Sequence, residues 1–289
     1  MTELKYKFTY DTLFKLLFVK YPDLLKWFVA AVLGIAVDSI TEFKITNPEI
    51  PPEALGDKFC RLDVNMAVDG IRVNLEVQVE NEGDYPERSL YHWARVYSSA
   101  LPVGRTYSEL PRVIIISIID ESVFDCEEYH SEFQPLEVTR RVPLTDRMVL
   151  HYFEVRKLPK DVDVKNELQL MLSLFRAKTE EELKQLERSG VPIVTQAVGA
   201  YREVTVSPEF KELERLRTLA RHNEASALCN ARRKESEKWQ KVVEKKDAAL
   251  ADSNAALALR DAALADSNAA LANKDAEIAR LRALLGGDR

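Results

Sequence analysis

Two neighbouring stretches in which apolar and polar residues alternate carry two carboxylates, Asp63 and Glu76, and the amide of Gln78. The stretches meet at Asp69-Gly70, and such a pair predicts a two-residue hairpin turn, because a type I′ turn needs positive φ at both central positions. Counting outward from this turn puts Asp63 directly opposite Glu76, with Cβ atoms about 5 Å apart. Like charges in that position destabilise a sheet, so we expect a compensating divalent cation such as Mg²⁺, which prefers carboxylate oxygens.

The same count fixes the register of the whole hairpin, because the apolar residues of its core face must meet one another. Gln78 then lies on the face of Glu76, two residues further along the strand. The pattern Asp63…Glu76-x-Gln78 indicates a metal-dependent site for phosphodiester cleavage. The alternative is an ordinary exposed strand face, where Asp, Glu and Gln are common. The expected pairs are Val68–Ile71, Ala67–Arg72, Met66–Val73, Asn65–Asn74, Val64–Leu75, Asp63–Glu76, Leu62–Val77 and Arg61–Gln78.

Four blocks of the chain resemble the PD-(D/E)xK nuclease superfamily, whose signature is an Asp followed by Glu-x-Lys on the next strand. More narrowly, the chain resembles the bacterial recombination-promoting nucleases, also described as PD-(D/E)xK nuclease family transposases. The resemblance covers the chain up to about Pro159. Gln78 stands where the superfamily has its lysine, although the narrower family commonly has Glu-x-Gln there. The matching blocks are Asp11–Phe18, Arg61–Val64, Leu75–Val79 and Glu87–Trp93.

This resemblance implies an α/β fold with a restriction-endonuclease-like core, a mixed central sheet flanked by helices. It implies a Mg²⁺-dependent DNA endonuclease that breaks DNA and promotes recombination or transposition. Asp63 and Glu76 would hold the metal with the backbone carbonyl of Val77, and Gln78 would orient the attacking water or donate to the phosphate. The alternative function is a catalytically weak module of the same fold that binds DNA or a partner and is oligomerised by its C-terminal coiled coil.

The helix after the hairpin carries Arg88, Tyr91 and Arg95, which lie three and four residues apart and therefore share one face. Basic and aromatic groups on a common face suit contacts with DNA phosphates and bases. The alternative is a core aromatic residue beside solvated arginines. The positive charge of the superfamily's lysine is expected to come from Lys58, Arg61 or Arg88, so Arg61 is a further candidate DNA contact.

The remaining elements are expected from periodicity and from cap residues. A buried β-branched run after the crossover helix should pair in parallel with the Glu76 strand, because hairpin, helix and strand form a βαβ unit. Asp11 and Lys15 lie one helical turn apart, and for Lys15 we expect an ion pair on a solvated face. The alternative, which the resemblance implies, is that this helix lines the rim of the active site, and Asp11 fits either interpretation. The expected helices begin near Asp11, at Pro22 (ending at Gly34) and at Pro86, and cover 166–176, 179–189 and 193–204; the expected strands are 40–45, 113–119, 138–142 and 148–155.

Composition limits the partners and the compartment. The net charge of −6 gives no global attraction to nucleic acid, so DNA contacts must rest on local basic patches. Three dispersed cysteines form neither a disulfide framework nor a zinc spacing. The longest apolar run, Trp27–Val37, is too short to span a bilayer, and the N-terminus lacks the pattern of a signal peptide. We therefore expect a cytoplasmic protein without membrane insertion.

The C-terminal part consists almost wholly of charged residues, Ala and Leu, and contains near-identical 14-residue units that begin at Asp247 and Asp261. One Leu recurs in each heptad, but the second seam position is polar, which predicts a long helix with weak coiled-coil self-association and a homodimer at best. A solvent-exposed helix without a partner is the alternative. The expected domains are a nuclease-like domain at 1–160, a helical extension at 161–206 and the long repeat-containing helix at 207–289.

Overall fold

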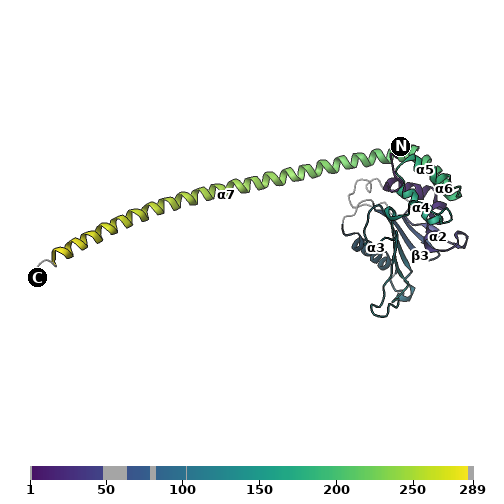
Figure 1. Cartoon of the computed structure of the whole chain (residues 1–289), viewed down its shortest axis with the longest axis horizontal. Helices are drawn as coiled ribbons and strands as arrows, with labels where there is room; N and C mark the ends of the chain where they lie inside the picture. The colour runs from purple at the N-terminus through teal and green to yellow at the C-terminus, as the bar shows by residue number, and fades with distance from the viewer. Residues whose placement is uncertain (1, 48–63, 79–82, 102, 286–289) are drawn as a thin grey trace. The chain divides into compact units, whose positions relative to one another are not determined.

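A computed structural model describes the chain except for residues 1, 48–63, 79–82, 102 and 286–289. The described residues form a mixed sheet of six strands in the order β1-β2-β3-β4-β6-β5, with helices on both faces (Figure 1). The expected α/β architecture is thus confirmed. The strands are β1 Phe43–Ile45, β2 Val64–Val68, β3 Ile71–Gln78, β4 Val113–Ile119, β5 His130–Phe133 and β6 Met148–Glu154.

The hairpin of β2 and β3 has the expected turn and register. Asp69 and Gly70 have φ of 45° and 80°, so both central residues have the positive φ that the turn requires. The Asp69 carboxylate also accepts hydrogen bonds from the backbone N–H groups of Thr41 and Glu42 at 3.0 and 2.7 Å, which ties the turn to the preceding segment. All five pairs from Val68–Ile71 to Val64–Leu75 are confirmed. The three pairs that involve residues 61–63 lie outside the described residues.

The crossover also follows the prediction. Helix α3 (Tyr85–Ser99) connects the hairpin to β4, which runs parallel to β3 and to β6 and is buried along its whole length. The expected strand at 138–142 is wrong. The Glu137 carboxylate accepts hydrogen bonds from the backbone N–H groups of Thr139 (3.3 Å) and Arg140 (2.6 Å), and Arg141 has a φ of 55°. These contacts hold the segment in a turn, and β5 forms earlier in the chain.

Helices α1 (Asp11–Lys20), α2 (Pro22–Leu33) and α4 (Glu167–Arg176) contribute, with one face of the sheet, to the larger of two hydrophobic clusters. The solvated ion pair that we favoured for Lys15 is wrong. Lys15 is only 3% exposed, and the Asp11 carboxylate lies 2.7 Å from the guanidinium of Arg217. Short 3₁₀ helices occupy Val37–Ser39, Tyr107–Glu109 and Val155–Lys157.

Helix α3 covers the other face of the sheet. A second hydrophobic cluster there joins Tyr85 to Ile115, Ile119, Leu150 and Tyr152. These strand residues share their face with Glu76 and Gln78, because Glu76 pairs with Ser117 and Gln78 with Ile119 across β3 and β4. The predicted catalytic face of β3 therefore lies against α3.

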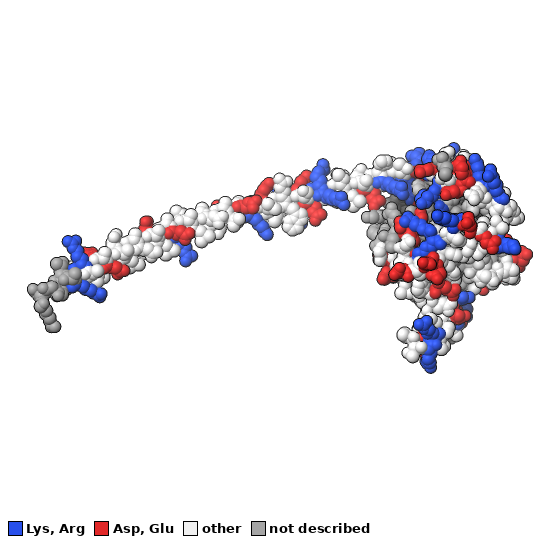
Figure 2. Space-filling model, in the orientation of Figure 1, with Lys and Arg blue, Asp and Glu red and all other residues white. Residues whose placement is uncertain are grey.

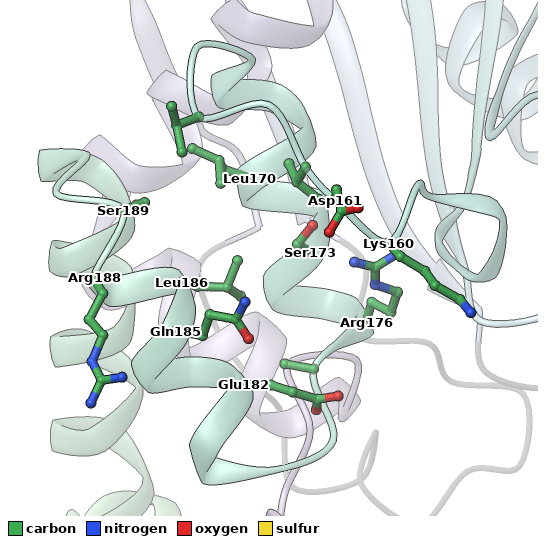
Figure 3. A pocket seen from close by; sticks show the side chains of 13 residues that line it. Lys160, Asp161, Leu170, Ser173, Arg176, Glu182, Gln185, Leu186, Arg188 and Ser189 are labelled. Atoms are coloured by element: carbon green, nitrogen blue, oxygen red, sulfur yellow. The ribbon is translucent and has the colours of Figure 1, made fainter.

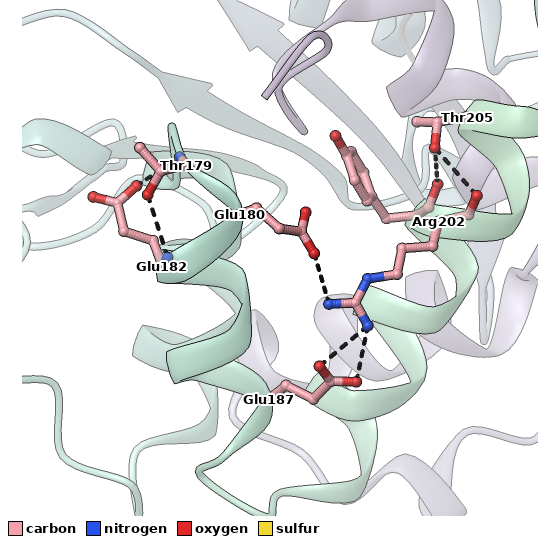
Figure 4. Close-up of polar contacts among 7 residues, drawn as sticks. Thr179, Glu180, Glu182, Glu187, Arg202 and Thr205 are labelled. Atoms are coloured by element: carbon pink, nitrogen blue, oxygen red, sulfur yellow. Dashed lines mark hydrogen bonds and ion pairs between the residues drawn. The ribbon is translucent and has the colours of Figure 1, made fainter. Parts of the chain in front are cut away.

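Helices α5 (Glu180–Glu187) and α6 (Pro192–Val206) complete the described helical region before the long C-terminal helix. Arg202 of α6 binds Glu180 at 2.9 Å and Glu187 at 3.2 Å, which joins the two helices (Figure 4). A pocket of about 370 Å³ lies between α4, α5 and the segment at 160–164, and Lys160, Arg176 and Glu182 are among its lining residues (Figure 3).

Helix α7 spans Pro208–Leu285, and the chain divides into two compact units, Met1–His222 and Asn223–Arg289. The first turns of α7 belong to the first unit, where Phe210 is fully buried with its ring 4.8 Å from that of Tyr6. In the second unit the heptad residues from Leu250 to Ile278 are 45–61% exposed. Among the described helices, none combines the length and apolar character needed to cross a membrane.

Candidate active site

Glu76 lies near the C-terminal end of β3 and is 1% exposed. Its two carboxylate oxygens differ in environment. Oε1 lies 2.6 Å from Nδ1 of His92, whereas the buried Oε2 accepts no hydrogen bond from any residue that the structure describes. Beside it on β4, the Oγ atom of the buried Ser117 also has no hydrogen-bond partner within the described part of the chain. A buried carboxylate oxygen needs a donor or a cation, so Oε2 is a candidate ligand atom.

His92 reaches Glu76 because α3 presents Tyr85, Ser89 and His92 at a spacing of four and three residues, which places them on one helix face. Ser89 Oγ forms a short hydrogen bond with the Tyr152 hydroxyl of β6 and also donates to the carbonyl of Pro86 at 2.9 Å. Burial raises the pKa of Tyr152; the Ser89 hydrogen bond opposes this rise, and the negative charge of Glu76 adds to it. These contacts fix α3 over the carboxylate.

Gln78 is 5% exposed and lies at the end of β3, where its backbone carbonyl accepts a hydrogen bond from the N–H of Asp120 at 2.9 Å. Two residues before Glu76, Asn74 donates through Nδ2 to Oδ1 of Asn65 at 2.7 Å. Asn74, Glu76 and Gln78 thus form a polar row on the face covered by α3. Val77 lies between the two predicted catalytic residues, and its side chain packs against the larger hydrophobic cluster.

Asp63 and Arg61 lie outside the described residues. Asp63 immediately precedes Val64, the last described residue of the ladder, whose partner is Leu75. Its position opposite Glu76 therefore stays a prediction, as does any role of Arg61. In the described residues, no group of three or more His, Cys, Asp or Glu is arranged to hold a metal ion.

The arginine and tyrosine that we predicted as DNA contacts lie in different environments on α3. Arg88 is half-buried, with its guanidinium 4.9 Å from the centre of the Tyr85 ring. Tyr91 is 58% exposed, and the Arg95 guanidinium lies 5.9 Å from the centre of its ring. The structure thus directs Arg88 toward the sheet and leaves Tyr91 and Arg95 at the surface.

The oxygen ligand that the described residues offer suits a hard cation. Glu76 supplies a buried carboxylate oxygen without another described partner, and oxygen ligands are those that Mg²⁺ prefers. His92 gives Glu76 an orienting hydrogen bond, of the kind that commonly holds metal-binding carboxylates in place. Our sequence reasoning missed His92. The helical spacing of Tyr85, Ser89 and His92, in a crossover helix that must pack on the sheet, is the signal by which it could have been found.

Comparison with known proteins agrees with this architecture. The family model for PD-(D/E)XK nuclease family transposases matches residues 8–231, more than half of the chain. Neither a curated protein nor a solved structure shows significant similarity to the chain. The mixed sheet, its flanking helices and the long C-terminal helix are consistent with the nuclease fold. From the family match and the fold together, the chain belongs to the PD-(D/E)XK nuclease family transposases.

Proposed function

We propose that the protein is a Mg²⁺-dependent DNA endonuclease whose metal is held by Asp63, Glu76 and the backbone carbonyl of Val77. The observation that carries this proposal is the divided environment of the Glu76 carboxylate. One oxygen is bound by His92, and the other is buried without a partner among the described residues. The family match adds that the fold belongs to nucleases.

The chain's own residues divide the work as follows. His92 holds Glu76 in one orientation, so that the carboxylate need not reorganise when it binds a ligand. A bound Mg²⁺ would supply a water of lowered pKa and would stabilise charge on the scissile phosphate. Gln78 donates a hydrogen bond to the attacking water or to the phosphate, as a neutral substitute for lysine. Arg88, and Arg61 beyond the described residues, add positive charge for the DNA backbone, and Tyr91 adds a stacking surface.

Strand breaks made by this enzyme would promote recombination or transposition. A cytoplasmic location is part of the same proposal, because the proposed substrate is DNA. We further propose homodimers formed through α7. Its heptad residues Leu250, Leu257, Leu264, Leu271 and Ile278 recur every seven residues and are about half exposed. Polar residues occupy the second seam position, so the association should be weak.

Cleavage of supercoiled plasmid tests this proposal. Full-length protein should nick the plasmid in Mg²⁺ and lose this activity in EDTA. Glu76→Gln is the matched control, because it keeps the side-chain shape and removes the charge. Mg²⁺-dependent cleavage by wild type alone supports the nuclease. If wild type and Glu76→Gln bind DNA equally but neither cleaves it, the alternative holds, namely a catalytically weak module oligomerised by α7.

A further inference from the structure

The most exposed large apolar side chains come from two loops that lie away from Glu76. Among the residues that the structure describes, the four large hydrophobic side chains with at least 80% exposure come from two segments, 103–107 and 138–144. Isolated exposed apolar residues are ordinary, but a group of them marks a surface that binds a partner molecule. The four are Val103, Tyr107, Val138 and Leu144.

The two segments form one surface. Arg147 donates through Nη2 to the carbonyl of Ser108 at 2.9 Å, and its own carbonyl accepts a hydrogen bond from the N–H of Val113 at 2.8 Å. Both segments therefore lie where the parallel strands β4 and β6 begin, at the opposite end of the strands from Gln78. We call residues 103–112 and 136–147 the two-loop tip. Figure 1 shows the corresponding teal segments projecting from the first unit beyond the strands.

Both loops are held in place by a glutamate. Glu109 accepts hydrogen bonds from the N–H and hydroxyl of Thr106 in a capping box, which fixes the turn that carries Tyr107. Glu137 accepts hydrogen bonds from backbone N–H groups of the turn that carries Val138. The hydrogen bond from the Arg140 N–H is the main cause that lowers the pKa of Glu137. The apolar residues are thus presented by preorganised turns, and binding them would need little ordering.

The two-loop tip carries an excess of positive charge on an acidic protein. It contains five arginines and three carboxylates, whereas the whole chain has a net charge of −6. Two of the three carboxylates, Glu109 and Glu137, accept the internal hydrogen bonds of the loops and also pair with Arg105 and Arg140, each at 3.2 Å. In Figure 2 the projecting end of the first unit shows blue Lys and Arg atoms beside uncharged white ones. The charge therefore complements a polyanion rather than a second copy of this acidic chain.

We infer that the two-loop tip binds duplex DNA at a distance from the cleavage site. Arginines such as Arg140 and Arg141 contact phosphates, and the exposed Val138 and Tyr107 pack against sugars or the floor of a groove. This inference rests on the proposed function, because DNA is the substrate. It adds a second anchoring surface, which fixes the direction in which the duplex leaves the site.

Binding of a fluorescent duplex by full-length protein, followed by anisotropy, tests the inference. All variants carry Glu76→Gln, so that cleavage does not disturb the measurement. The tip variant combines Arg140→Gln with Arg141→Asn, since Asn tolerates the positive φ of 55° at position 141. The control combines Lys184→Gln with Arg215→Gln, which removes the same charge from exposed helical positions.

We expect the tip variant to bind about tenfold more weakly than the control and to lose about two from the slope of log affinity against log salt. Equal affinity and slope in both variants would overturn the inference that the two-loop tip binds DNA and would leave the nuclease proposal intact. If the protein that carries Glu76→Gln alone binds no duplex at all, the nuclease proposal fails, and the inference about the two-loop tip fails with it. Unchanged DNA binding with a reduced mass in light scattering would instead identify the tip as a contact between copies of the protein, which also overturns the inference.

Discussion

The hydrogen bond between His92 and Glu76 is the described contact on which the site depends, and His92→Leu removes it. Leucine keeps the helix and fills much of the ring volume, but it donates no hydrogen bond. The Glu76 carboxylate would then lie 1% exposed with neither oxygen bonded by a described residue. Leaving a buried charged group unsatisfied is among the few mechanisms that destabilise a protein by several kcal/mol.

The size of the expected loss of stability in His92→Leu follows from the burial of the Glu76–His92 pair. Breaking a fully buried pair by removing one partner costs about 3–5 kcal/mol. The His92 side chain is 30% exposed, so water can replace part of the lost bond, and we expect a loss of about 2 kcal/mol in the free energy of unfolding. In Glu76→Leu/His92→Leu the stranded charge is absent. The double variant should therefore be more stable than the sum of the single variants implies, with a coupling of about 2 kcal/mol.

Urea unfolding in EDTA, followed by circular dichroism, measures this coupling. Tyr91→Leu is the matched control, because it changes a neighbouring aromatic residue on the exposed side of α3 and should cost less than about 0.5 kcal/mol. Single-variant losses that add within about 0.5 kcal/mol would refute the reasoning, since they would show that His92 and Glu76 do not depend on each other.

Gln78→Ala should lower single-turnover cleavage by about 10²–10³-fold, whereas Gln78→Lys should keep or raise it through a charge-assisted donor; equal rates for wild type and Gln78→Ala would remove Gln78 from the site. Burial lowers the pKa of His151 from 6.5 to about 4. The stability that neutral His151 provides is therefore complete above pH 6.5 and is lost as the pH falls toward 4, by roughly 3 kcal/mol. Urea midpoints from pH 8 to 4 should fall less steeply in His151→Gln than in wild type, and parallel curves would contradict this. Truncation after His222 should keep the head folded, because Phe210 and Arg217 remain, and should weaken self-association; an unchanged oligomeric mass would reject the role of α7.

Local patterns were sufficient for most of the sheet. Asp69-Gly70 and the alternation around it determine the hairpin register, and the nearly unbroken β-branched run of Val113–Ile119 predicts a strand buried on both faces. The segment at 138–142 has similar β-branched character but forms a turn, because the Glu137 side chain competes for its backbone N–H groups. Propensity does not reveal such a side-chain contact.

The candidate site was predictable only in part, for a related reason. Glu76 and Gln78 could be assigned to one strand face from their spacing, since the period of a strand is two. The bond from His92 joins residues 16 apart, and its geometry depends on how α3 packs on the sheet. Lys15 shows the same limit, because its spacing from Asp11 suggested an exposed pair, whereas packing buries Lys15 and gives Asp11 to Arg217.

Plasmid cleavage by Asp63→Ala and Glu76→Ala tests most directly whether these two carboxylates form a metal-dependent nuclease site. We predict that both variants lose Mg²⁺-dependent cleavage while keeping the circular dichroism spectrum of the wild-type protein. The spectrum matters because it separates loss of the site from loss of the fold. Cleavage at the wild-type rate in Mg²⁺ by both variants would contradict the assignment and place the active site elsewhere in the chain.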